Sequence, residues 1–325
     1  MSTINFSIGI PAYKGKFLSD CILSILNQTY SHFELIIIND CSPDPIERIV
    51  EQFHDNRIRY FINDKNIGAE NVILNWNKCL EKANNNFFIL MGDDDKMEPD
   101  YLEEITNLIN KYPSLDIFHC RSKIIDESSN CIGLTPMCPE FESVYDNIWH
   151  SMKGYRIPYI SDFVYRTSTL KMHQGFYNLP LAWASDNISS YIVMEAKGIA
   201  HTNKPLLNYR SHPLSITSSG NYELKMKATV QQQEWFQEFL NNKPSSKNDL
   251  IIYKDLCNNI HKIMQKKKVY TVAYSLKENS SVNVVKWIYR RKKYGLSFSE
   301  IVYSFVVYLK EKKARKTKLK TVSRY

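Results

Sequence analysis

Apolar and polar residues alternate along the first 120 residues with two different periods. Short apolar runs, typical of buried strands, occur at residues 6–10, 35–38, 58–62, 87–91 and 117–120. Between these runs, apolar residues recur at helical spacing over residues 17–26, 45–53, 69–83 and 99–109. Repeated β-α units of this length predict an α/β domain built on a mostly parallel, doubly wound sheet.

The pattern changes twice farther along the chain. Residues 121–220 lack a long periodic run, so we expect them to be rich in loops, and they are dense in aromatic residues. These rings fit either a packed core or a cleft that stacks on sugars. From residue 222 onward the period is helical, with helices expected at 231–240 and 250–264. We therefore expect one domain at 1–221 and a helical extension at 222–325.

Composition narrows the class of protein. The chain has 325 residues, of which 43% are hydrophobic, so it can bury a substantial core. Its seven cysteines include no Cys-x-x-Cys pair, which predicts reduced thiols. No signal peptide is expected, and no apolar run reaches the roughly 18–20 residues of a membrane-spanning helix. The expected location is cytoplasmic.

The net charge of +8 is distributed unevenly. Residues 262–325 contain 18 Lys and Arg against 3 acidic residues, whereas residues 1–261 contain 24 against 31. Five apolar residues of the tail share one helical face: Ile301, Val302, Phe305, Val306 and Leu309. A lysine-rich run follows them, so the tail is predicted to bind the surface of an anionic membrane without crossing it. The alternative is a helical subdomain packed on the first domain. Nucleic-acid binding fits less well, since no recognition fold accompanies the charge.

Three consecutive aspartates, Asp93, Asp94 and Asp95, follow the apolar run at 87–91. They would lie at the carboxyl end of a buried strand, which is the edge where open α/β sheets bind ligands. Adjacent carboxylates repel one another unless a cation neutralises them, and oxygen ligands favour Mg²⁺ or Mn²⁺. The sequence therefore predicts a divalent-cation site. The alternative is an acidic turn that caps the helix beginning at Pro99.

Short motifs point to a family. The chain contains neither a Gly-x-Gly-x-x-Gly after its first strand nor the phosphate-binding loop of nucleoside triphosphatases. Over residues 4–220 it instead resembles the family 2 glycosyltransferases of the GT-A fold. The matching segments read, in order, SIGIPAYK, SILNQTYSHFELIIINDCSPD, NIGA, MGDDDKMEPDYLEE, RTSTLKMHQGF, ASDN and YRSHPLS.

The resemblance implies a pocket for the nucleotide of a sugar donor. Asp40, at the end of the second strand, would hydrogen-bond to the uracil or ribose, and Asn66 with Gly68 would form a loop beside the nucleotide. The first wall of the pocket would consist of Pro11, Ala12 and Tyr13. From its position alone, Asp40 could instead form an Asx-type turn before Ser42.

The acidic cluster matches the metal-binding element of the family. Asp94 aligns best with its metal ligand, so the resemblance assigns Asp94 and Asp95 to Mn²⁺ or Mg²⁺ and Asp93 to the donor. The first aspartate of the usual pattern falls at Gly92, which leaves the division of roles among the three open. The cation would bridge the two phosphates of the donor and neutralise charge as the nucleoside diphosphate leaves.

Two further segments carry implied roles. Asp186 matches the catalytic base, which accepts the proton of the acceptor hydroxyl as that oxygen attacks the anomeric carbon. Its alternative role is to cap a helix. Arg210 and His212 match a loop that closes over the diphosphate. The chain departs from many relatives in the helix after the Asn-x-Gly loop, where Asn75-Trp76-Asn77 replaces Ala-Arg-Asn.

Together these features predict a metal-dependent, inverting glycosyltransferase at the inner face of a membrane. The resemblance implies a nucleotide-sugar donor, most simply a UDP-sugar, and a lipid-linked or growing surface polysaccharide as acceptor. The alternatives are a transferase that uses a dTDP- or GDP-sugar, and a catalytically inactive relative that binds glycans or serves as a scaffold.

Overall fold

The computed structural model describes residues 3–212, 221–277 and 280–322. Contacts divide the chain into two compact units, Met1–Ser218 and Ser219–Tyr325. The first unit is an α/β domain, and the second is helical.

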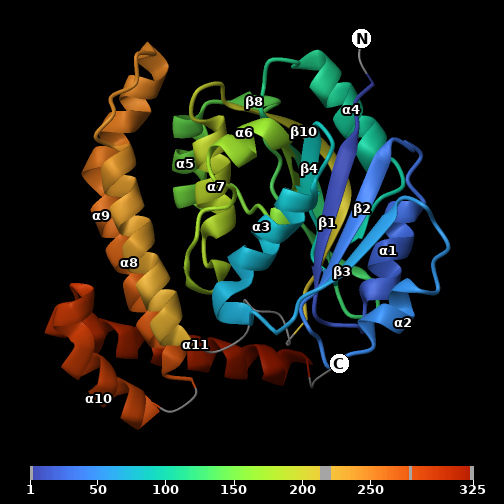
Figure 1. Cartoon of the computed structure of the whole chain (residues 1–325). Coiled ribbons are helices and arrows are strands. Elements are labelled where there is room, and N and C mark those ends of the chain that lie inside the picture. The colour runs from blue at the N-terminus through green and yellow to red at the C-terminus, as the bar shows by residue number, and fades with distance from the viewer. Residues whose placement is uncertain (1–2, 213–220, 278–279, 323–325) are drawn as a thin grey trace. The chain divides into compact units, whose positions relative to one another are not determined.

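One sheet organises the first unit, and its strand order along the main path is β3-β2-β1-β4-β9-β6-β10-β5 (Figure 1). β1 pairs in parallel with β2 and β4, β2 with β3, and β6 with β10. β9 is antiparallel to both of its neighbours, β4 and β6. The strands are β1 (Phe6–Ala12), β2 (Phe33–Asn39), β3 (Ile58–Ile62), β4 (Phe87–Leu90), β5 (Lys96–Met97), β6 (Ile117–Ile125), β7 (Cys131–Leu134), β8 (Phe141–Glu142), β9 (Phe163–Arg166) and β10 (Ile199–Arg210). The predicted mostly parallel, doubly wound sheet is confirmed.

Helices cover both faces of this sheet (Figure 1). The helices of one face, α1, α2 and α4, bury apolar residues against the even-numbered positions of β1, such as Ile8 and Ile10. α3 packs on the opposite face, where Cys79 adjoins Gly9 of β1. The α-helices of this unit are α1 (Leu18–Leu26), α2 (Ile46–Val50), α3 (Val72–Lys82), α4 (Tyr101–Lys111), α5 (Val144–Met152), α6 (Thr167–Met172) and α7 (Ser185–Met194).

The middle of the chain is more ordered than its sequence pattern predicts. The expectation of a loop-rich segment at 121–220 is wrong for much of its length, because α5, α6, α7, β9 and β10 lie within it. β10 escaped detection because polar residues and Pro205 interrupt its apolar positions, and its pairing with β6 shifts register on both sides of Pro205.

The second unit consists of helices with a core of their own. They are α8 (Tyr222–Phe239), α9 (Lys247–Ser275), α10 (Ser280–Arg290) and α11 (Phe298–Val322). Trp287 is buried in this core, and its indole Nε1 donates to Ser275 Oγ at 2.7 Å. α8 begins before its predicted range and α9 extends beyond its range at both ends, because lysines and other polar residues continue a helix without an apolar period. Among the described residues, no helix combines the length and apolarity needed to cross a bilayer.

The parallel strands bring distant segments to one edge of the sheet. β1, β2, β4, β6 and β10 run in the same direction, so their carboxyl ends share that edge. The residues that follow these ends form the candidate site.

Candidate active site

The acidic loop connects β4 to β5, and its three aspartates have different surroundings. Asp95 is buried, and its two carboxylate oxygens accept hydrogen bonds from Ser161 Oγ at 2.8 Å and Arg210 N at 3.0 Å. Burial and the nearby charge of Asp94 raise the pKa of Asp95 well above its usual range. Through these hydrogen bonds Asp95 anchors the acidic loop to β10, and its role as a metal ligand stays a prediction.

Asp93 anchors the same loop to the end of β1. Its Oδ2 accepts hydrogen bonds from the backbone N–H groups of Tyr13 at 2.9 Å and Lys14 at 2.8 Å. Burial and the neighbouring Asp94 carboxylate raise the pKa of Asp93 to about 6. The backbone of Tyr13 thus adjoins the acidic loop, and Pro11 and Ala12 are the last residues of β1. The predicted place of these three residues in the wall of the nucleotide pocket stays a prediction.

Asp94 pairs with a histidine from the segment after β10. His212 Nε2 lies 2.7 Å from Asp94 Oδ2, and 19% of the Asp94 side chain is exposed. Asp94 is thus partly open to solvent, whereas Asp95 is enclosed. Pro213, Leu214 and Ser215 of the YRSHPLS segment lie outside the described residues.

The close approach of these carboxylates explains the glycine at position 92. A Cβ there would lie 2.9 Å from Asp94 Oδ1 and 3.0 Å from Asp95 Oδ2. Any larger residue, including the aspartate of the usual pattern, would have to displace them. The alternative in which the acidic turn caps the next helix is wrong, because β5 intervenes and Asp100 occupies the N-cap of α4 without a side-chain cap bond.

Arg210 lies at the end of a strand and not in a closing loop. Its side chain is fully buried, with the guanidinium 4.2 Å from the ring centre of Phe17. Its donors go to the carbonyl oxygens of Asp94, Asp126 and Glu127, at 2.9–3.3 Å, and to a serine hydroxyl. Arg210 thus joins the acidic loop to the loop after β6, and its expected role beside the diphosphate stays a prediction.

Asp40 organises the loop that contains Asn66 and Gly68. Its Oδ1 accepts hydrogen bonds from Asn63 Nδ2 and Ile67 N, both at 2.9 Å, and its Oδ2 accepts one from Asn66 Nδ2 at 3.2 Å. The Asx-type turn belongs to Asn39, whose Oδ1 accepts from Ser42 N at 2.9 Å. The turn alternative is therefore wrong for Asp40.

Two asparagines of the Asn75-Trp76-Asn77 segment of α3 hold neighbouring loops. Asn75 Oδ1 accepts from the same Asn63 amide that holds Asp40, at 2.7 Å. Asn77 Oδ1 accepts from Phe176 N at 2.8 Å, on the segment that leads towards α7. α3 thus supports both the Asp40 network and the loop before Asp186.

Asp186 begins α7 directly after a strained loop. Leu181, Ala182 and Ala184 have φ values of 61°, 52° and 73°, in the left-handed region that costs a non-glycine residue about 1–3 kcal/mol. Such strain clusters at functional sites, where the surrounding structure enforces it. The Asp186 carboxylate accepts from Asn187 N at 2.8 Å and is partly exposed. The strained loop packs against Ala69–Asn71, next to Gly68.

The acidic loop is chemically suited to a divalent cation. It concentrates carboxylates whose pKa values are raised by burial and mutual repulsion, and a cation would relieve both effects. Carboxylate oxygens favour Mg²⁺ or Mn²⁺. Asp94 and His212 would hold such an ion, with Asp93 alongside.

Sequence reasoning missed several residues that build this site. Ser161 links Asp95 to the N–H of Gly92, which donates to Ser161 Oγ at 3.0 Å. Asn63 and Asn77 hold the two loops described above. Ser161 and Asn63 stand in no motif that the resemblance uses. Asn77 matches the last residue of the Ala-Arg-Asn segment, but its partner Phe176 lies 99 positions away in the chain.

Comparisons with known proteins agree with this architecture. The family model of glycosyl transferase family 2 matches residues 7–170. An uncharacterized glycosyltransferase of Haemophilus influenzae is 25% identical over 242 residues, which cover 72% of this chain and 74% of that protein. The putative teichuronic acid biosynthesis glycosyltransferase TuaG of Bacillus subtilis is 34% identical over 101 residues, 30% of this chain and 39% of that protein.

Solved structures share the fold across nearly the whole chain. The crystal structure of S. aureus TarS 1–349 in complex with UDP-GlcNAc has a TM-score of 0.65 at 15% identity and covers 96% of this chain and 92% of that one. The mannosyltransferase PcManGT from Pyrobaculum calidifontis, in complex with GDP-Man and Mn²⁺, has a TM-score of 0.56 at 11% identity. It covers 94% of this chain and 87% of that chain.

Proposed function

The chain belongs to glycosyl transferase family 2, and from this premise we propose that it transfers a sugar from a nucleotide-sugar to a hydroxyl group of a surface polysaccharide. The observation that carries the proposal is the pairing of Asp94 with His212 at the sheet edge where β1, β2 and β10 end. Open α/β sheets bind nucleotides at this edge.

The proposed donor is a UDP-sugar. Asp40 and the Asn66–Gly68 loop form the nucleotide side of the site, and Asp93 fixes the end of β1 beside it. Support comes from the fold of TarS, whose structure contains UDP-GlcNAc. PcManGT, with GDP-Man and Mn²⁺, supports a GDP-sugar as the competing choice.

The proposed reaction is an inverting displacement. The Asp186 carboxylate accepts the proton of the acceptor hydroxyl, whose oxygen forms a bond to the anomeric carbon as the bond to the nucleoside diphosphate breaks. Asp94 and His212 would hold Mn²⁺ or Mg²⁺, which when bound neutralises the charge of the leaving diphosphate. Arg210 positions the acidic loop through two hydrogen bonds: its backbone N–H donates to the Asp95 carboxylate, and its Nε donates to the carbonyl oxygen of Asp94.

The proposed acceptor is carried on a lipid, which suits an enzyme that attaches to the inner face of a membrane. Support comes from α10 and α11, where Val285, Tyr289, Val302 and Phe305 are exposed. Tyr289 is 88% exposed.

Replacing Asp186 with asparagine tests the reaction. Because Asn has nearly the same shape but cannot accept the proton, Asp186→Asn should lower kcat by about 10²–10⁴-fold while nucleotide affinity stays within about twofold. Nucleoside diphosphate release from UDP-sugars, with a polysaccharide acceptor, is the readout. Glu195→Gln, at the exposed end of the same helix, is the matched control and should keep full activity. Equal turnover in Asp186→Asn and the control would refute the role of Asp186.

A further inference from the structure

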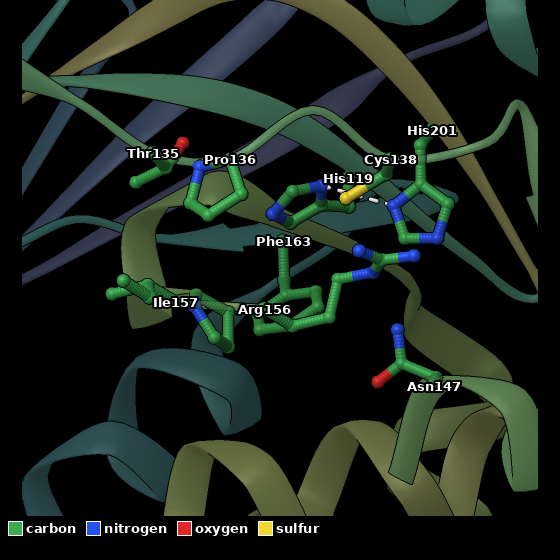
Figure 2. Close-up of a pocket in the computed structure, with 10 residues that line it drawn as sticks. His119, Thr135, Pro136, Cys138, Asn147, Arg156, Ile157, Phe163 and His201 are labelled. Atoms are coloured by element: carbon green, nitrogen blue, oxygen red, sulfur yellow. Dashed lines mark hydrogen bonds between the residues drawn. The ribbon is translucent and has the colours of Figure 1, made fainter. Parts of the chain in front are cut away.

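A second cluster of metal-binding side chains lies away from the acidic loop. His119 of β6 and His201 of β10 are register partners on neighbouring strands, and Cys138 lies on the segment between β7 and β8. All three residues are buried, and their ligand atoms lie within 4.8 Å of one another. In Figure 2 the two imidazoles face each other, with the Cys138 sulfur beside the line that joins them.

The two imidazole rings face each other through their Nδ1 atoms. His119 Nδ1 and His201 Nδ1 are 3.0 Å apart. The other nitrogen of each ring faces a carboxylate: His201 Nε2 lies 3.1 Å from Glu142 Oε2, and His119 Nε2 lies 3.4 Å from Asp162 Oδ1. Carboxylates accept protons, so each ring is expected to keep its hydrogen on Nε2. The two Nδ1 lone pairs would then point at each other, which is unfavourable unless a cation lies between them.

A tautomer change does not remove the conflict. Placing a hydrogen on one Nδ1 would create an N–H···N bond, but the Nε2 lone pair of that ring would then face a buried carboxylate. His201 Nε2 and Asp162 Oδ1 are indeed buried without a well-formed hydrogen bond among the described residues. Buried polar atoms without partners are uncommon and require an explanation.

We propose that His119, His201 and Cys138 bind one Zn²⁺ ion through two imidazole Nδ1 atoms and a thiolate. Nitrogen and sulfur ligands suit zinc and do not suit the Mg²⁺ or Mn²⁺ of the acidic loop. Zn–N distances of about 2.0–2.1 Å imply tetrahedral N···N separations of about 3.4 Å, so the rings need to part by only a few tenths of an ångström. A cavity of about 10 Å³ adjoins all three side chains, enough for roughly one water-sized ligand in the fourth position.

The surrounding residues complete a typical metal environment. Metal-binding histidines usually donate their second N–H to a carboxylate, which orients the ring. Glu142 is itself held by Asn147 Nδ2 at 3.0 Å and by an ion pair with Arg156, and Asp162 Oδ2 accepts from Ser122 Oγ at 3.0 Å. With these charged groups and the thiolate ionised, Zn²⁺ leaves the buried cluster electrically neutral.

The position of the site indicates a structural role. His119 is the third residue of β6 and so lies near the amino end of that strand. The acidic loop lies at the opposite edge of the sheet, where the parallel strands have their carboxyl ends. The ion would join β6, β10 and the segment before β8, three parts of the chain that span residues 117–210. Ser161 contacts Asp95 of the acidic loop and Asp162 faces His119, so these two adjacent residues connect the two sites.

Titration of the metal-stripped full-length chain with Co²⁺, followed by competition with Zn²⁺, tests the proposal. One equivalent of Co²⁺ should produce visible bands of a tetrahedral site together with a thiolate charge-transfer band, and Zn²⁺ should displace it. Cys138→Ser should lose the charge-transfer band, and His201→Gln should weaken binding by more than about 100-fold. Cys131→Ser, which removes an exposed free thiol, and Asp94→Ala, which alters the acidic loop, should leave the spectrum unchanged.

Circular dichroism identifies variants that fail to fold, and Glu142→Gln then serves as the milder substitution. It leaves all three ligands in place and should weaken Zn²⁺ binding by about 10–100-fold, as expected for a carboxylate behind a ligating histidine. A chain that gives no tetrahedral Co²⁺ spectrum, or folded Cys138→Ser with the wild-type spectrum, would overturn the proposal. Such a result would mean that the histidine pair shares a proton and holds no metal.

Discussion

Adjacent residues of identical type perform different tasks in the acidic loop, because each accepts hydrogen bonds from different donors. Asp93 is held by backbone N–H groups of the segment after β1, and Asp95 by Ser161 and the backbone of Arg210. Asp94 is left to pair with His212 in a partly exposed position. The sequence indicated the site but not this division, since the partners of Asp95 lie 66 and 115 positions away in the chain.

The raised pKa of Asp93 leads to a prediction about stability and pH. Its folded-state pKa of about 6 exceeds the usual value of about 3.9, so ionised Asp93 destabilises the folded state above pH 6. In metal-free buffer at pH 7.5, Asp93→Asn should therefore raise Tm; a gain of about 1 kcal/mol corresponds to roughly 2–4 °C. The gain should shrink as the pH falls from 6 to 4, because the folded wild type takes up the proton first. A Tm difference that is constant with pH would contradict this account.

Gly92 yields a second prediction at this scale. In Gly92→Ala the new Cβ would come within 3.0 Å of two carboxylate oxygens and displace Asp94 from His212. Metal-dependent nucleotide binding should weaken by at least about tenfold, as measured by calorimetry. Gly133→Ala is the matched control, because its Cβ would meet Ile124 at an ordinary 3.5 Å. Unchanged binding in Gly92→Ala would show that the acidic loop tolerates a shift.

At the scale of elements, the sequence predicted the strands that consist of nearly uninterrupted apolar residues. β1, β2 and β4 are runs of buried apolar residues, so their pattern alone revealed them. β10 was missed, although it supplies Arg210 and His201, because its pairing with β6 is decided by tertiary contacts and not by an apolar period. The same limit hid the facing of His119 and His201, which depends on strand register.

α3 offers a test at this scale. Asn77→Ala would leave the N–H of Phe176 without its acceptor and cost about 1–3 kcal/mol. We expect a lower Tm together with reduced transferase activity, since Phe176 lies on the segment that leads to Asp186. Asn71→Ala, at the N-cap of the same helix, removes an exposed side chain that makes no cap bond and should have little effect. If Asn77→Ala kept the wild-type Tm and activity, the claim that α3 supports the loop before Asp186 would be wrong.

The whole molecule separates acidic and basic regions. Residues 262–325 carry the excess of Lys and Arg, and apolar side chains of α11, such as Val302 and Val306, are exposed next to them. Of the five residues predicted to form the apolar face, Ile301 is buried in the core of the helical unit and the other four are exposed. A basic helix with exposed apolar residues is typical of reversible membrane attachment.

Membrane attachment can be measured by co-sedimentation with vesicles. The full chain should bind vesicles that contain phosphatidylglycerol and not vesicles of phosphatidylcholine alone, and salt should weaken binding. Each lysine contributes about 1 kcal/mol near an anionic surface, so Lys310, Lys312 and Lys313→Ala together should weaken binding about 100-fold. A control triple variant changes three exposed lysines of α9 and should bind normally: Lys247, Lys254 and Lys262→Ala. Equal losses in both variants would argue against a specific role for α11.

The central claim is a nucleotide-sugar site that depends on a divalent cation and is formed around Asp94. Calorimetric titration with UDP, GDP and dTDP, each with and without Mn²⁺, tests it most directly on three proteins: wild type, Asp94→Ala, and Glu47→Ala as an exposed control on α2. We predict that wild type and the control bind UDP only with Mn²⁺, and that Asp94→Ala loses this binding. Binding of no nucleotide in the presence of Mn²⁺, or binding that Asp94→Ala retains in full, would contradict the account.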